Sequence, residues 1–296
     1  MNVKLNKYKM KKNLFFLLLM AAVMSSCEVL NNMAGSEIAN AISENLTEQI
    51  TSRVGTVDPD AVASAASSLA SALTISNNEI VALCQEHMEE MDTINYVLPD
   101  DDPYSERLVR VMSRFKNLGN LKLNYAVYDD ENTINAFASG DGSVRVYSGL
   151  MDLMDDDELF AVIGHELGHL VNHDVRDAYR TAYLVVAARY GLASFGDRAS
   201  AISMGFLGDL SDELANNAYS RHQETKADEA AYRYCIANNV DPYAMYHALK
   251  KLDSVSGKSG EKTSGFANMF SSHPDTVKRI NHIKEMAEKD GHVLDD

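Results

Sequence analysis

Residues 165–169 of the chain read His165-Glu166-Leu167-Gly168-His169. On an α-helix, four residues advance about 6 Å and return nearly to the starting direction, so both imidazoles can reach one metal ion. The carboxylate of Glu166 then lies beside that ion, where it can accept a proton from water but is poorly aimed to become a ligand. The stretch therefore predicts a zinc site with a general base, and the plain alternative is a chance match of a short motif.

The residues around this stretch have the period of a helix with one apolar face. That face carries Leu159, Phe160, Ile163, Leu167, Leu170 and Val171, whereas His165, Glu166, His169 and His173 lie on the other side. Asp155 to Asp157 supply an N-cap and favourable charge at the start of the helix. We therefore expect one side in the core and the other facing a cleft. Gly164 and Gly168 form a separate strip, which predicts that another backbone approaches closely there.

A catalytic zinc ion usually has three protein ligands and keeps its fourth position for water. Glu224 is the candidate for the third ligand, in a helical stretch from about 212 to 237. Ala227, Asp228, Ala231 and Cys235 share its face. The small residues would let this helix approach the glycine strip, and Asp228 could accept the second ring N–H of a ligating histidine. Without the zinc motif, this would be read as a solvated acidic face.

Four segments together resemble metallopeptidase family forty-eight, which contains the CAAX prenyl proteases, the HtpX-like proteases and a bacterial lipoprotein branch. They are Asn135-Ala136-Phe137-Ala138, the stretch 165–169, the Glu-x-x-Ala-Asp segment at 224–228, and Ser272-His273-Pro274 followed by Arg279. The resemblance covers roughly residues 77 to 290. The set of membrane-spanning helices of the prenyl proteases is not evident here, so isoprenylated substrates are not expected.

The resemblance implies an α+β fold: a mainly helical gluzincin metalloprotease with a small β-sheet beside the zinc helix. It also implies that His165, His169 and Glu224 bind one zinc ion and that Glu166 is the general base. His173, four residues after His169, is expected at the surface or behind a ligand.

Further roles follow from the same resemblance. His273 would stabilise the oxyanion, Arg279 would pair with Asp228, and the strand containing Asn135, Ala136 and Phe137 would bind the substrate. The exposed edge of a sheet can pair with an extended peptide. A purely structural hairpin is an alternative of comparable weight.

The N-terminus predicts where the protein works. Five lysines precede an apolar run from Leu14 to Met24 that is too short to span a bilayer, as in a secretory signal. The run ends at Met24-Ser25-Ser26-Cys27, which resembles a bacterial lipobox, so residues 1–26 would be removed and Cys27 lipidated. Ordinary signal cleavage is the alternative. We expect a protein tethered by its lipids to a membrane of the bacterial cell envelope and facing the periplasm.

Charge and cysteine content narrow the class of protein. Cleavage would remove five of 27 Lys and Arg and none of the 43 Asp and Glu, which moves the formal charge from -16 to -21. Nucleic acid is therefore not expected as a partner. Beyond Cys27, only Cys84 and Cys235 remain, so the fold does not depend on disulfides, and whether these two pair is open.

The rest of the chain divides into an arm or spacer rich in Ala and Ser at 27–76 and a protease domain at 77–296. In the domain we expect helices near 78–91, 104–116, 242–254 and 274–289. Strands are expected near 121–127, 135–138 and 143–147. Residues 175–216 are expected to form a core helix, with a mobile lid as the weaker alternative.

The sequence as a whole predicts a zinc metalloendopeptidase. Its substrates would be misfolded or unassembled envelope proteins, in protein quality control. The alternative is a chaperone or assembly factor with a mainly structural zinc site, although a structural site rarely needs a base such as Glu166.

Overall fold

In the computed structural model, residues 75–116, 121–193, 206–215, 218–256, 273 and 276–294 are described. The chain divides into two compact units, and the one considered below comprises Ile75–Val186 and Ser200–Asp296. The predicted signal peptide, Cys27 and the arm up to residue 74 lie outside the described residues. No described helix combines the length and the apolar character that are needed to cross a bilayer.

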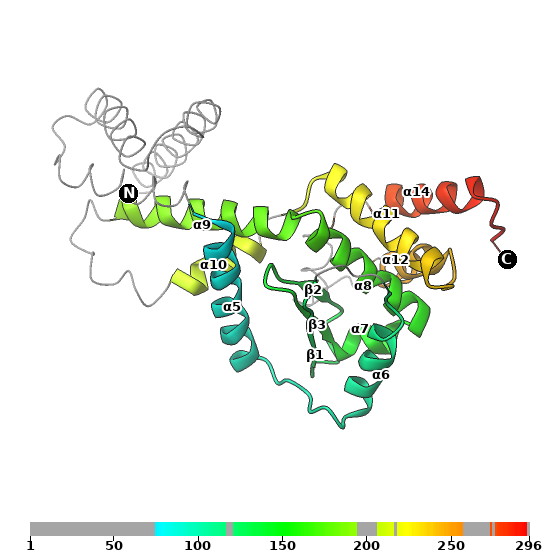
Figure 1. Ribbon diagram of the computed structural model, residues 1–296, viewed down its shortest axis with the longest axis horizontal. Coiled ribbons are helices and arrows are strands. Elements are labelled where there is room, and N and C mark those ends of the chain that lie inside the picture. Colours follow the sequence, from blue (N-terminus) through cyan, green and yellow to red (C-terminus); the bar gives the residue numbers. More distant parts are fainter. Residues whose placement is uncertain are drawn as a thin grey trace, which may run out of the picture. The chain divides into compact units, whose positions relative to one another are not determined.

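The described part of the chain is mainly helical, with one small sheet (Figure 1). The helices are α5 (Asn77–Ile94), α6 (Pro103–Met112), α7 (Ser148–Leu153), α8 (Asp156–Val171), α9 (Asp174–Ala193), α10 (Phe206–Ala215), α11 (Arg221–Ala237), α12 (Ala244–Ser256) and α14 (Thr276–Lys289). The strands are β1 (Asn124–Tyr128), β2 (Ala136–Ala138) and β3 (Ser143–Tyr147). The predicted α+β fold class is confirmed.

The sheet has the order β1-β3-β2, so the last strand in sequence lies in the middle. β1 pairs with β3 in parallel and β2 pairs with β3 in antiparallel. The expected strand near residue 121 begins only at Asn124, and Tyr125 is exposed whereas Val127 is buried. The middle strand β3 is buried along most of its length, including Arg145, whose guanidinium pairs with Asp92 at 2.8 Å.

Helix α8 lies in the core, packed against β2, α6, α11 and α12 (Figure 1). Its start is fixed by a capping box: the Asp155 carboxylate accepts from the backbone N–H of Asp157 and Glu158, and the Glu158 carboxylate accepts from the N–H of Asp155. Every residue from Glu158 to Leu170 is buried. The expectation that one side faces an open cleft was therefore wrong in this structure, and so was the burial of Val171, which is exposed.

The glycine strip of α8 lies against α11, as expected. A Cβ at Gly168 would come within 3.0 Å of the Ala227 Cα and 2.9 Å of the Ala230 Cβ. A Cβ at Gly164 would have more room, at 3.4 Å from the Ala231 Cα. Small residues on both helices therefore bring the two backbones close together, which places Glu224 of α11 beside the histidines of α8.

Two other helical predictions need correction. The stretch from about 212 to 237 is not one helix, because residues 218–220 are not helical and the Ser220 side chain caps a new helix, α11. The expected helix 104–116 ends at Met112. The described part of 175–216 forms α9 and α10, and Val175, Tyr179 and Leu210 pack with Ile80 and Cys84 of α5, as expected of core helices.

Candidate active site

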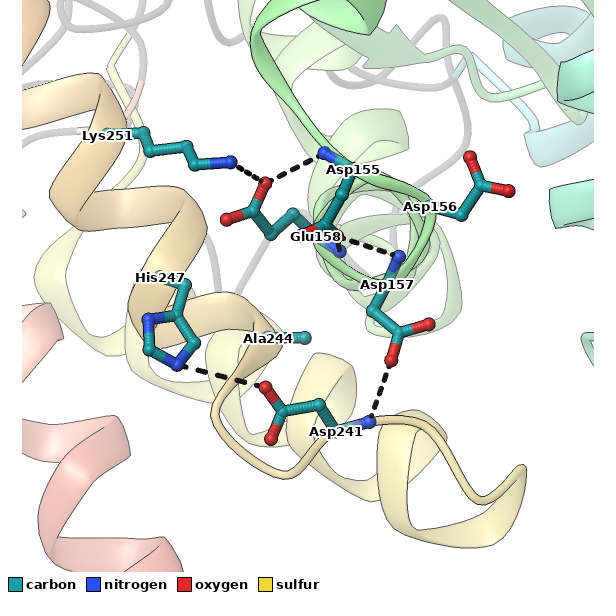
Figure 2. A pocket seen from close by; sticks show the side chains of 8 residues that line it. All are labelled: Asp155, Asp156, Asp157, Glu158, Asp241, Ala244, His247 and Lys251. Carbon is teal, nitrogen blue, oxygen red and sulfur yellow. Dashed lines mark hydrogen bonds and ion pairs between the residues drawn. The ribbon is translucent and has the colours of Figure 1, made fainter. Parts of the chain in front are cut away.

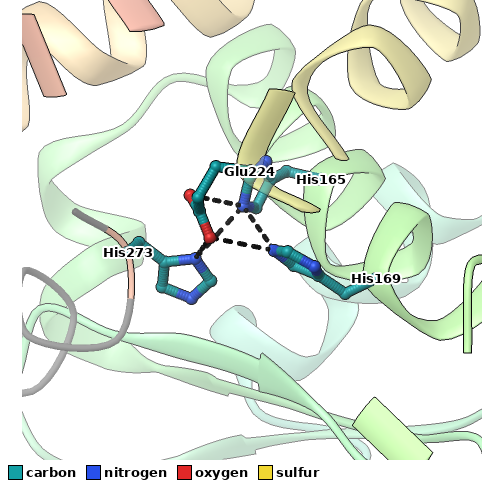
Figure 3. Close-up of side chains that lie close together, drawn as sticks. All are labelled: His165, His169, Glu224 and His273. Carbon is teal, nitrogen blue, oxygen red and sulfur yellow. Dashed lines mark hydrogen bonds and ion pairs between the residues drawn. The ribbon is translucent and has the colours of Figure 1, made fainter. Parts of the chain in front are cut away.

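Four side chains from three parts of the chain meet in one buried cluster: His165 and His169 from α8, Glu224 from α11, and His273. One ligand atom of each lies within 4.8 Å of the others (Figure 3). All four side chains are almost fully buried. The structure thus brings together the three predicted zinc ligands and one further donor.

The distances within this cluster suit a tetrahedral metal site. The Nε2 atoms of His165 and His169 are 3.1 Å apart, and His169 Nε2 is 3.3 Å from Glu224 Oε1. His273 Nδ1 lies 3.3 Å from His165 Nε2 and 3.0 Å from Glu224 Oε1. Ligand atoms around a tetrahedral zinc ion with bonds of 2.0–2.1 Å lie about 3.3 Å apart. The donors fit zinc in kind, and these four distances fit it in spacing, while His165 Nε2 lies 3.7 Å from Glu224 Oε2.

Carboxylates that contact Nδ1 set the tautomers of both α8 histidines. His165 Nδ1 lies 2.9 Å from the Asp228 carboxylate, and His169 Nδ1 lies 2.9 Å from the carboxylate of Asp174. Because a carboxylate only accepts hydrogen bonds, both Nδ1 atoms carry the proton and both Nε2 atoms of the neutral rings present lone pairs. These lone pairs face each other and Glu224 among buried side chains. A cation, either a proton or a metal ion, is needed between them.

The pKa shifts of the cluster residues are consistent with a cation in this site. Burial and the nearby Arg279 lower the pKa of His165 to about 4. Burial would also lower the pKa of His169, but hydrogen bonds with Asp174 and Glu224 raise it to about 9. Burial alone would raise the pKa of Glu224, yet hydrogen bonds with His169 and His273 hold it well below its usual range. The site therefore keeps an ionised carboxylate and holds one positive charge.

Arg279 of α14 lies beside Glu224 and Asp228 of α11. Its guanidinium donates to the two Asp228 carboxylate oxygens at 2.7 and 2.8 Å, the pairing that the resemblance implied. It also lies 2.7 Å from Glu224 Oε2, an ion pair without hydrogen-bond geometry. Oε1 faces His169 and His273, at 3.3 and 3.0 Å, whereas His165 Nε2 lies 3.7 Å from Oε2.

Glu166, the predicted base, is 3% exposed, and its Oε1 atom makes no hydrogen bond within the described residues. Nε2 of His273 lies 3.6 Å from it. A buried carboxylate oxygen without a partner is costly to maintain. Such an oxygen beside a metal cluster is suited to accept a proton from water.

His273 was predicted to stabilise the oxyanion from outside the ligand set. In this structure its Nδ1 lies beside Glu224 Oε1 and His165 Nε2 as a fourth donor atom of the cluster. A water molecule and His273 would therefore compete for the fourth position on the ion. The oxyanion role requires the ring to turn away from Glu224.

The residues predicted to bind substrate lie on β2, at one edge of the described sheet and packed against α8. Asn135 O accepts from Tyr147 N, and the register places Phe137 opposite Arg145. In an antiparallel ladder the intervening residues then direct their backbone groups to the other edge. Ala136 and Ala138 thus offer the unpaired edge, rather than Asn135 and Phe137.

Sequence reasoning missed Asp174, Tyr219 and Gln223, all of which lie around His169. Asp174 is five residues after His169, beyond the end of α8, so helical periodicity could not point to it. Tyr219 stacks on the His169 ring with centroids 4.0 Å apart and an interplanar angle of 14°. His173 is exposed at the turn between α8 and α9, in agreement with the surface role expected for it.

A pocket of about 590 Å³ lies at the opposite end of α8 from the histidines (Figure 2). It is lined by Asp155, Asp156, Asp157, Glu158, Asp241, Ala244, His247 and Lys251. Its buried carboxylate, Glu158, is paired with Lys251 and caps α8. None of its residues belongs to the metal cluster, and its contacts hold α12 against the start of α8.

Known proteins are similar to this chain. The model of peptidase family M48 matches residues 99–287. The chain is 31% identical to the metalloprotease LoiP of Escherichia coli K12, over 79% of this chain and 91% of LoiP. It is 32% identical to the metalloprotease YcaL of the same strain, over 72% of this chain and 82% of YcaL. An HtpX homologue of Aquifex aeolicus is 28% identical over 65% of this chain and 74% of its own length. The matched region contains all four residues of the cluster.

Proposed function

We propose, from the premise that this chain belongs to peptidase family M48, that His165, His169 and Glu224 hold the zinc ion of a metalloendopeptidase with Glu166 as its base. The single observation that carries the proposal is the arrangement of the two imidazoles. Carboxylates fix both rings so that their Nε2 atoms lie 3.1 Å apart. The lone pairs of these two atoms point to the same place as Glu224. Only a cation makes that arrangement stable in a buried site.

When bound there, zinc would polarise the scissile carbonyl and lower the pKa of a water molecule toward about 7. Glu166 would accept a proton from the attacking water through Oε1, which makes no hydrogen bond within the described residues, and would then donate it to the leaving amine. Asp228 and Asp174 keep the two rings in the tautomer that presents Nε2. Arg279 keeps the Glu224 carboxylate ionised and oriented.

His273 has two positions in this scheme. In the position observed here, its Nδ1 is a fourth donor atom of the cluster and could itself bind the ion. Once rotated toward the substrate, its ring can donate a hydrogen bond to the charge that develops on the carbonyl oxygen. His273→Ala is expected to lower turnover while zinc stays bound by the other three residues.

The substrate is placed by backbone pairing along β2. Ala136 and Ala138, both buried in this structure, direct their backbone groups to the edge of β2 away from β3, and an extended peptide could pair there as a further strand once that edge is accessible. Ala136→Pro removes one N–H donor from that edge and leaves the pairing with β3 intact, because Pro is tolerated on an edge strand. It is expected to raise KM for peptides without changing the zinc content.

Glu166→Gln tests the base directly. The variant is expected to bind zinc as the wild type does, measured by elemental analysis, and to lose about 10²–10⁴-fold of its turnover on a quenched fluorescent peptide. Glu90→Gln is the matched control, since Oε2 of Glu90 is also buried without a hydrogen-bond partner, in a residue outside the cluster. Full activity of Glu166→Gln would exclude Glu166 as the base.

The cellular role that we propose is quality control at the bacterial envelope, with Cys27 lipidated and the enzyme facing the periplasm. The support is the lipobox-like segment at 24–27 and the similarity to two metalloproteases of a Gram-negative bacterium. Cys27→Ser should release the protein from the membrane fraction. Misfolded or unassembled envelope proteins should accumulate with Glu166→Gln, as seen by proteomics. Full complementation of a deletion strain by Glu166→Gln would instead favour a chaperone or assembly factor with a structural zinc site.

A further inference from the structure

The ring of His169 is held by groups that are not themselves ligands. Its Nδ1 donates to Oδ2 of Asp174 at 2.9 Å, and both side chains are buried. The Tyr219 ring lies flat against the imidazole, with centroids 4.0 Å apart. The other Asp174 oxygen, Oδ1, accepts from Nε2 of Gln223 at 3.0 Å. The imidazole is thus fixed at one edge and on one face.

Asp174 reaches His169 because the chain reverses directly after α8. The helix ends at Val171, and His173 adopts φ 67°, in the left-handed region. Helix α9 then begins at Asp174, whose carboxylate points back to the ring five residues earlier. The tight turn, rather than the helical repeat, creates this contact.

Gln223 links this carboxylate to the helix that carries Glu224. The side-chain Oε1 of Gln223 accepts from the backbone N–H of Ser220 at 2.9 Å, and the backbone N–H of Gln223 donates to Oγ of Ser220. These two hydrogen bonds form the capping box of α11. Its side-chain N–H2 group remains for Asp174. Tyr219 directly precedes Ser220, so the stacked ring and the cap belong to the same short segment. The start of α11 and the orientation of His169 therefore depend on the same contacts.

We propose that Asp174 and Tyr219 are positioning residues that fix the His169 imidazole for the metal, and that Gln223 fixes Asp174. The proposal rests on the assignment of His169 as a zinc ligand. Carboxylates behind ligating histidines typically change metal affinity by about 10–100-fold. Stacking of two aromatic rings contributes about 1 kcal/mol, which corresponds to about 5-fold in a binding constant.

Asp174→Ala and Asp177→Ala form a matched pair. Both carboxylates lie in the first turn of α9, but Asp177 is exposed and pairs with Arg180. The dissociation constant for zinc is measured by competition with a chromophoric chelator, and the melting temperature of the metal-free protein is measured alongside. We expect Asp174→Ala to raise the dissociation constant about 10–100-fold and Asp177→Ala to leave it unchanged. Equal affinity of the two variants would overturn the proposal.

Tyr219 and Gln223 have matched variants of their own. Tyr219→Phe keeps the stacked ring and should bind zinc like the wild type, whereas Tyr219→Leu should lose about 5-fold. Ser220→Ala and Gln223→Leu both remove the cap of α11 and should lower the melting temperature similarly, but only Gln223→Leu should weaken zinc binding. Equal zinc affinity of these two would exclude the link through Gln223.

The same measurements separate this proposal from the ligand assignment. His169→Ala removes the ring itself and must weaken zinc binding more than Asp174→Ala does. If His169→Ala binds zinc as tightly as the wild type, the ligand assignment fails. If His169→Ala weakens zinc binding but Asp174→Ala, Tyr219→Leu and Gln223→Leu bind as the wild type does, the ligand assignment stands and the positioning roles are excluded.

Discussion

Gly168→Ala tests whether the zinc site depends on the close approach of α8 and α11. The added Cβ would lie 2.9 Å from the Ala230 Cβ and 3.0 Å from the Ala227 Cα. Carbon atoms prefer a separation of about 3.5–4.0 Å, so the two helices must move apart by about 0.5–1 Å. Glu224 lies one turn before Ala227 on the same helix and would move with it. A shift of this size at a reacting centre is sufficient to cost about 10²-fold in rate.

Two opposing contributions set the expected change in the free energy of unfolding. Replacing Gly by Ala inside a helix stabilises it by about 1 kcal/mol, whereas overpacking a core typically costs about 1–3 kcal/mol. Gly168→Ala should therefore lower the free energy of unfolding by about 1 kcal/mol. Gly164→Ala is the control, because its Cβ would lie 3.4 Å from the Ala231 Cα, which is ordinary contact. That variant should be unchanged or more stable by up to about 1 kcal/mol.

Both variants are compared by urea unfolding of the metal-free protein and by zinc competition. The expected order of zinc affinity is wild type and Gly164→Ala together, with Gly168→Ala weaker. Equal stability and equal zinc affinity of the two alanine variants would refute the argument that close helix packing positions Glu224.

Further predictions concern residues outside the cluster. His173→Gly relieves a left-handed conformation and should raise the free energy of unfolding by up to about 1 kcal/mol with unchanged zinc content; loss of zinc would contradict the surface role of His173. Asp92→Ala leaves the buried Arg145 without its carboxylate partner, although its hydrogen bonds to Asn124 remain, and should cost about 1–2 kcal/mol in urea unfolding because Asp92 is partly exposed. Although burial opposes it, the hydrogen bond from Arg145 lowers the pKa of Asp92, so this stabilisation should be present above about pH 4 and lost as the pH falls through the lower folded-state pKa. A pH-independent effect would count against the ion pair. Burial raises the pKa of both the Cys84 and Cys235 thiols to about 12, so mass spectrometry should detect no alkylation by iodoacetamide at pH 8 before unfolding.

Much of the candidate site could be predicted from the sequence, because the contacts of these residues are local or depend on local patterns. His165 and His169 are four residues apart on one helix, so helical geometry alone brings their rings together. Glu224 and Asp228 are also one turn apart, and the small residues Ala227 and Ala231 on their face matched the strip at Gly164 and Gly168. Two helices with small residues at their contact can pack closely, which made this long-range pairing predictable.

Other parts of the site depend on contacts that no local pattern contains. Arg279 lies 55 residues after Glu224, and its pairing with Asp228 was expected only by resemblance, while its contact with Glu224 was not expected. Strand order was also not evident, because β3 reaches the middle of the sheet by pairing with two strands that precede it. The long arm at 27–74 lies outside the described residues and stays a prediction.

Sequence alone thus determined the chemistry of this protein: two imidazoles, a base and a carboxylate at helical spacings that suit zinc, in a mainly helical α+β domain. Tertiary structure alone decided how these groups are held. The left-handed turn at His173 returns Asp174 to His169, and the packing of α14 brings Arg279 to the acidic face of α11. The physical reason is that helix spacing is set by neighbouring residues, whereas the partner behind each ligand is set by where distant segments meet when the core closes.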